Sequence, residues 1–147
     1  MEEKLLYNCN KLSLDYLNKL VETNAWKAFA TIHAGIHHQL CMILRYKFKK
    51  DNSLNLHKEK WNIIKKKYFA PLVNDLFVVG LIENPLKTKL LDFNTKRNQK
   101  LGHINIYEKI EIPDEEIKEI CLDGIEIIKE LDKIIETIFF KEKERKK

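Results

Sequence analysis

The chain contains long stretches in which no residue interrupts a helix. Only four glycines and three prolines occur in 147 residues, whereas Leu, Lys and Glu, which favour helices, are abundant. Apolar residues make up 44% of the chain and charged residues 33%, a balance typical of a folded globular protein. The length fits one domain, so the sequence predicts a single all-α domain over residues 1–147.

The longest predicted helix covers residues 25–49, "AWKAFATIHAGIHHQLCMILRYKFK". Its apolar residues recur at steps of three and four, which places them on one face of a helix of about six to seven turns. That face consists of Trp26, Phe29, Ile32, Ile36, Leu40, Ile43 and Leu44. This segment is therefore expected to form the centre of the core.

Two further helices are predicted on either side of this segment. Ser13 can cap a short helix that ends near Asn24, with four apolar residues on one face. A third helical region begins near residues 56–57 and runs toward Gly80. Pro71 lies inside it and is expected to kink or divide it, because proline lacks the N–H of a helical hydrogen bond.

The last two helices begin at prolines. Asn84 followed by Pro85 is a typical helix start, and this helix runs toward Gly102 with Leu86, Leu90 and Phe93 facing inward. The final helix begins at residues 113–114 and has a seam of isoleucine and leucine residues. Residues 104–112 alternate apolar and polar side chains, which suits an extended segment, and residues 141–147 form a charged tail. The predicted fold is a bundle of about five mostly antiparallel helices.

The net charge and the cysteine content indicate which kind of partner and which location suit the protein. The net charge of +5 and the pI of about 9.0 suit an anionic partner such as RNA. Three scattered cysteines fit reduced thiols better than a disulfide framework. The sequence starts with no signal-peptide pattern and contains no apolar run long enough to span a membrane. We therefore expect a cytoplasmic protein without a membrane partner.

A histidine-rich stretch in the longest helix is the first candidate site. His33, His37 and Cys41 are spaced four residues apart and share one helical face. Such a face can bind zinc, but a metal normally needs further ligands from another element. The alternative is that these side chains line a groove or an interface and hydrogen-bond locally. Cys41 beside His37 also has the spacing of a nucleophile pair, although a cysteine on an apolar face usually acts as a small hydrophobic residue.

The second candidate site lies where the helix from Asn84 ends. Arg97, one of three arginines, is followed by Asn98 and, after six positions, by His103. Lys96 and Lys100 add positive charge beside Arg97 and can attract phosphates. Other chemistry leaves no pattern, since the chain lacks a Gly-rich phosphate loop, a Gly-x-Ser-x-Gly turn, a Cys-x-x-Cys pair and a His-Glu-x-x-His pair.

This Arg-x5-His pattern at the end of an amphipathic helix resembles the HEPN superfamily (higher eukaryotes and prokaryotes nucleotide-binding domains). Members of that family are helical bundles with an Arg-x(4–6)-His motif, and a polar residue such as Asn commonly follows the arginine. Arg97, Asn98 and His103 match these positions. The resemblance in architecture covers roughly residues 24–140.

The resemblance implies a metal-independent endoribonuclease, often a toxin or defence effector, that acts as a homodimer and needs no cofactor. His103 would move a proton as general base or acid while the RNA 2′-hydroxyl attacks the neighbouring phosphorus. Arg97 would hold the phosphate and stabilise the transition state, and Asn98 would orient the phosphate or the histidine. Substrate-binding candidates around this motif are Lys96, Lys100, His37 and Tyr107.

The chain departs from one branch of the family. Toxins that pair with nucleotidyltransferase antitoxins typically carry Arg-x4-His-x-Tyr, whereas here the interval is five residues and Tyr107 lies four after His103. The role of Tyr107 and a nucleotidyltransferase partner therefore stay open. Two alternatives to the ribonuclease also remain: a non-catalytic module that binds a nucleotide or a protein, and a metal-binding bundle that uses His33, His37 and Cys41.

Overall fold

The computed structural model describes residues 14–49, 54–100 and 114–145, which form six helices and no strand. The side chains of residues 46–49, 54–57, 114 and 139–145 are not described. The first helix covers residues 14–23. The others are α2 (Ala25–Lys49), α3 (Leu54–Ile64), α4 (Phe69–Val78), α5 (Asn84–Lys100) and α6 (Asp114–Arg145).

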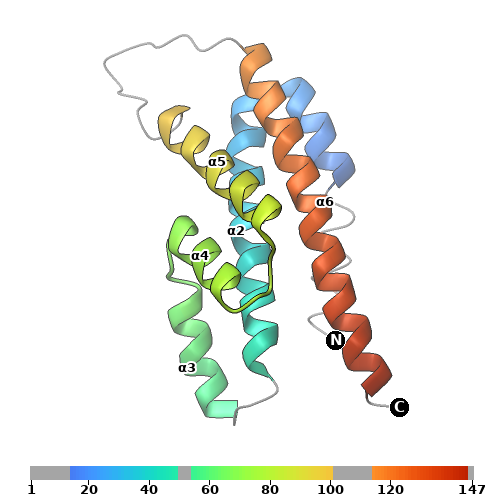
Figure 1. Cartoon of the computed structure of the whole chain (residues 1–147). Coiled ribbons are helices and arrows are strands. Elements are labelled where there is room, and N and C mark those ends of the chain that lie inside the picture. Colours follow the sequence, from blue (N-terminus) through green and yellow to red (C-terminus); the bar gives the residue numbers. More distant parts are fainter. Residues whose placement is uncertain (1–13, 50–53, 101–113, 146–147) are drawn as a thin grey trace.

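The two longest helices, α2 and α6, pack side by side along their lengths and run in the same direction (Figure 1). At one end the Cys121 thiol donates to the Ala25 carbonyl at 3.4 Å. Further along, Gln39 Nε2 donates to the Ile128 carbonyl at 3.2 Å and to Asp132 Oδ1 at 2.7 Å. Successive helices along the chain reverse direction, so the parallel pair arises because α3, α4 and α5 lie between α2 and α6 in sequence.

The core lies where α2 meets α4, α5 and α6. Apolar residues at helical spacing on α2 are buried, as the sequence predicts, and so is the seam of α6. Gly124 on α6 allows the closest approach: a Cβ there would lie 2.6 Å from Ile32 Cγ2 and 2.8 Å from Phe93 Cε2. The fully buried side chains include Phe29, Ile32, Ile36, Leu40, Ile43, Leu72, Leu76, Leu90, Ile117 and Leu131.

Pro71 divides the third predicted helical region into α3 and α4. α3 ends at Ile64, and α4 starts at Phe69 after Tyr68, whose backbone is extended with φ −69° and ψ 160°. Pro71 lies in the first turn of α4, where the N–H that it lacks has no helical partner. The prediction of a division is confirmed, but α3 begins at Leu54 instead of residues 56–57.

The helix α5 begins at Asn84 as predicted and packs against both α4 and α6. The chain turns from α4 into α5 through Gly80, whose φ of +76° is a conformation that residues with a Cβ rarely adopt. Leu86, Leu90 and Phe93 are buried, which confirms the inward face predicted for this helix.

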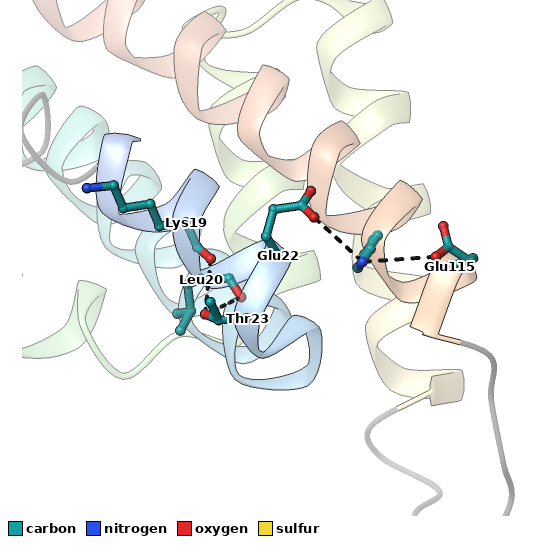
Figure 2. Close-up of polar contacts among 6 residues, drawn as sticks. Lys19, Leu20, Glu22, Thr23 and Glu115 are labelled. Atoms are coloured by element: carbon teal, nitrogen blue, oxygen red, sulfur yellow. Dashed lines mark hydrogen bonds and ion pairs between the residues drawn. The ribbon is translucent and has the colours of Figure 1, made fainter.

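The first helix packs beside the start of α6, where charged side chains meet (Figure 2). Lys118 Nζ lies 3.7 Å from Glu22 Oε2 and 4.0 Å from Glu115 Oε1. Thr23 donates its hydroxyl to the Lys19 carbonyl at 3.0 Å, inside the last turn of the first helix. These exposed ion pairs contribute little stability, so burial of the apolar face of this helix holds it in place.

The prediction of an all-α single domain is confirmed, with six helices where the sequence suggested about five. The segment 104–112, predicted to be extended, lies outside the described residues. The sequence suggests a tail from residue 141, but α6 continues to Arg145. Among the described residues, no helix has the length and apolar character that crossing a bilayer requires.

Candidate functional site

The half-buried ring of His33 on α2 is held between α4 and α5. Its Nε2 atom donates to Asn94 Oδ1 at 3.0 Å. The ring stacks on Phe69, with centroids 4.6 Å apart and planes at 21°, and lies 6.1 Å from the Phe93 ring. Three helices therefore fix the orientation of one imidazole. We refer to His33, His37, Phe69, Asn94 and Arg97 as the histidine–arginine cluster.

Arg97 lies three residues after Asn94 on the same face of α5, close enough to His33 for its charge to act on the ring. Burial lowers the pKa of His33 below its ordinary value, the Asn94 hydrogen bond opposes that shift, and the charges of Arg97 and His37 lower the pKa further. The structure thus keeps a neutral imidazole beside a permanent positive charge.

The three cations at the end of α5 differ in their partners. Lys96 Nζ lies 3.2 Å from Asp92 Oδ2, and Lys100 Nζ lies 2.7 Å from Glu116 Oε1 on α6. No carboxylate in the described ranges lies within ion-pair distance of Arg97, whose Nη1 donates to Asn98 Oδ1 at 3.2 Å. Described carboxylates partly offset the charges of the two lysines, whereas no described carboxylate offsets that of Arg97.

The other residues of the predicted motif divide into two groups. Asn98 is exposed and contacts Arg97, as the hydrogen bond between them shows. His103 and Tyr107 lie outside the described residues. The structure therefore describes the arginine half of the Arg-x5-His motif and its surroundings on α2 and α4.

His37, the substrate-binding candidate on α2, binds the turn between α3 and α4. Its Nε2 atom donates to the Lys67 carbonyl oxygen at 2.8 Å. In a continuous helix that carbonyl would accept from residue 71, but Pro71 has no N–H to donate. His37 thus satisfies a backbone oxygen that the division of the helix leaves without a partner.

The metal hypothesis gains no support from the arrangement of its three residues. The Nε2 atoms of His33 and His37 donate to Asn94 and to the Lys67 carbonyl, on different elements. In the part of the chain that the structure describes, no three His, Cys, Asp or Glu side chains are grouped to hold a metal ion.

Cys41 is also a poor nucleophile. Its Sγ atom lies 3.9 Å from His37 Nδ1 and 3.8 Å from the Ile64 carbonyl oxygen, inside the core. Burial raises the pKa of the Cys41 thiol to about 11, so the reactive thiolate is scarce at neutral pH. Cys41 packs as a small apolar residue, which was the alternative left open by its sequence position.

Two members of the cluster are missing from the sequence-based candidates. Asn94 precedes Arg97 by three residues and therefore shares its helical face, a spacing that could have identified it. Phe69 has no such signal, because its contact with His33 depends on how α4 packs against α2.

No family model, curated protein or solved structure matches this chain. The geometry of the cluster and the motif in the sequence therefore carry the functional proposal.

Proposed function

We propose that the chain is a HEPN-type endoribonuclease that cleaves RNA without a metal ion, at a site built from Arg97, Asn98 and His103. The observation that carries this proposal is the environment of Arg97. Its guanidinium has no carboxylate partner in the described ranges, while both neighbouring lysines do. An arginine in this state is suited to bind a phosphate with two parallel hydrogen bonds.

The reaction proposed for this site transfers a phosphoryl group within the RNA. The 2′-hydroxyl oxygen attacks the adjacent phosphorus, the bond from phosphorus to the 5′-oxygen breaks, and a 2′,3′-cyclic phosphate and a 5′-hydroxyl form. His103 accepts the 2′-proton or donates a proton to the leaving 5′-oxygen. Arg97 stabilises the charge on the pentavalent transition state, and Asn98 helps to hold the Arg97 side chain in place.

Cleavage of a fluorescent single-stranded RNA in EDTA tests this function. Wild-type protein should produce 2′,3′-cyclic phosphate ends, and a substrate with a 2′-deoxy nucleotide at the cleaved position should stay intact. Arg97→Ala and His103→Ala should each reduce the rate at least about 100-fold, the range expected for loss of one transition-state contact or one acid–base group.

A cation elsewhere on α5 provides the matched control. Lys89 lies about two turns before Arg97 and pairs with Glu130 of α6 at 2.7 Å. Lys89→Ala should cleave RNA at the wild-type rate. If folded wild-type protein cuts no RNA, or if Lys89→Ala loses as much activity as Arg97→Ala, the proposal is wrong.

Assembly and location belong to the same proposal. A homodimer would bring two copies of the motif to one cleft, and light scattering of the purified protein measures that state. The ribonuclease proposal includes a cytoplasmic location. It also includes an antitoxin partner, of nucleotidyltransferase or another type.

A non-catalytic binding module is the second candidate, and one surface favours it. A largely apolar groove of about 350 Å³ lies between α3 and α4. Two residues that line it, Ile63 and Val78, are 63% and 82% exposed. Exposed apolar surface of this kind is common where a protein binds a partner. A folded protein that cleaves no RNA would direct attention to this groove.

A further inference from the structure

The most exposed large apolar side chain in the described part of the chain is Tyr68, at the start of α4. Tyr68 is 84% exposed, although it lies between the buried Ile64 and the buried Phe69 in the chain. Tyr68 is the N-cap residue of α4, and its side chain makes no capping hydrogen bond. The Tyr68 side chain is therefore not used for packing within the described fold and can contact a ligand.

The backbone that carries this ring is fixed by contacts on both sides. The Lys67 carbonyl accepts from His37 at 2.8 Å, and the Tyr68 carbonyl accepts from the Leu72 amide at 3.1 Å. The next residue, Phe69, is buried and stacks on His33. A ring presented on an ordered backbone loses little conformational entropy when a planar ligand stacks on it.

Three lysines directly precede Tyr68 in the chain. Lys65 and Lys66 are exposed, and no carboxylate of the described ranges lies within ion-pair distance of either. Lys67 is paired with Asp75 at 2.8 Å, so its charge is offset. Proteins bind single-stranded nucleic acid with exposed aromatic rings and lysines, because the bases stack on the rings and the lysines neutralise the phosphates.

The turn is also adjacent to the histidine–arginine cluster. Tyr68 lies between two residues whose contacts reach His37 and His33, and the Arg97 charge acts on His33. In Figure 1 this start of α4 lies beside α2 and below the middle of α5. A strand whose phosphate is held at Arg97 can therefore continue along the turn.

We propose that Tyr68, with Lys65 and Lys66, is a base-stacking platform for single-stranded RNA next to the Arg97 site. The platform rests on the proposed function, because it extends the surface that holds the substrate. A protein-docking role for the ring is less well supported: Tyr68 does not line the apolar groove between α3 and α4.

Binding measured without cleavage tests the platform separately from catalysis. The probe is a fluorescein-labelled 12-nucleotide RNA with 2′-O-methyl groups throughout, which lacks the attacking hydroxyl. Fluorescence anisotropy in EDTA at low salt should give an affinity that Tyr68→Ala weakens about 5- to 100-fold, the value of one stacked base. Tyr68→Phe and Tyr68→Trp should bind like wild type, since stacking needs the ring and not the hydroxyl.

Further variants and probes separate stacking from a loss of structure. Tyr16, in the first helix, is the other tyrosine with a largely exposed ring in the described ranges, at 53%, and Tyr16→Ala should bind RNA like wild type. A set of probes each carries one abasic nucleotide at a different position. One of these probes should bind wild-type protein more weakly than the intact probe, and the same probe should bind Tyr68→Ala no more weakly than the intact probe does. The double variant Lys65→Ala/Lys66→Ala should weaken binding and reduce its dependence on salt concentration by about two phosphate contacts.

Several results would overturn the platform. They are wild-type affinity in Tyr68→Ala, equal losses in Tyr68→Ala and Tyr68→Phe, or a change of oligomeric state in Tyr68→Ala without a change in RNA binding, which would identify a protein contact. Catalysis is measured with the cleavable single-stranded RNA and not with the 2′-O-methyl probe. If binding depends on Tyr68 but no RNA is cleaved, the ribonuclease is refuted and the platform stands. If RNA is cleaved but binding does not depend on Tyr68, the ribonuclease stands and the platform is refuted.

Discussion

The Nε2 atom of His33 on α2 lies 3.0 Å from Oδ1 of Asn94 on α5, and this hydrogen bond joins two helices whose residues are 61 positions apart. It also joins the two candidate sites of the sequence, the histidine-rich face of α2 and the arginine motif of α5. The imidazole and the guanidinium are consequently coupled through charge.

Two substitutions on α5 should shift the pKa of His33 in opposite directions. Arg97→Ala removes a nearby positive charge and should raise that pKa toward its ordinary value. Asn94→Ala removes the hydrogen bond that favours the protonated ring and should lower it further. NMR titration of the ring resonances, assigned with His33→Gln, measures both shifts. An unchanged pKa in Arg97→Ala would show that the two groups do not interact, and Lys89→Ala should leave the pKa as in wild type.

The stability of the protein should decrease as the pH falls from about 7.5 to 5.5. Burial lowers the pKa of both His33 and His38 in the folded state. Below the ordinary value of about 6.5 the unfolded chain therefore binds more protons than the folded protein, so the free energy of unfolding falls with pH. Urea unfolding at the two pH values measures this difference, and the double variant His33→Gln/His38→Gln should show a smaller one. An equal or larger difference in that variant would assign the effect to other groups.

Alanine at two glycines of the bundle should have opposite effects on stability. At Gly124 a Cβ would collide with Ile32 and Phe93, so Gly124→Ala should destabilise the fold by about 1–3 kcal/mol. At Gly35, on the exposed side of α2, an added Cβ would have no atom within 4 Å apart from its chain neighbours and the local helix backbone. Gly35→Ala should therefore stabilise the helix by about 0.5–1 kcal/mol. Thermal and urea unfolding of the two variants measure both effects. The prediction is wrong if Gly124→Ala leaves the free energy of unfolding unchanged.

Two cysteine thiols should react slowly in the folded protein. Cys41 and Cys121 are buried, and burial raises the pKa of each thiol to about 11. Because the thiolate is the reactive form, each should react with a thiol reagent at pH 8 about 100-fold more slowly than an unfolded cysteine. A Cys9→Ser variant isolates these two thiols, and reaction in urea gives the unfolded rate. A fast thiol in the native Cys9→Ser protein would show that one helix opens readily.

The helix boundaries were predictable wherever the signal is local. The start of α5 at Asn84 follows from an Asn-Pro pair, and the division at Pro71 follows from a missing N–H. The start of α3 was placed two or three residues late, because Asp51, Asn52 and Ser53 are all cap-forming residue types and do not single out one start. Arg97 could be singled out because arginine is rare in this chain. The sequence could not show that Lys96 and Lys100 form ion pairs with described carboxylates while Arg97 does not, because ion pairing depends on which carboxylates the fold brings within reach.

The sequence by itself determined the all-α class, the buried faces and the presence of an arginine motif at the end of α5. Those properties depend on residue spacing along one helix, which is fixed by 3.6 residues per turn. Only the tertiary structure decided that α2 and α6 run parallel, that Asn94 and Phe69 hold His33, and that His37 binds the Lys67 carbonyl. Each of these depends on which faces of separate helices meet, and that is set by the packing of side chains distant in sequence.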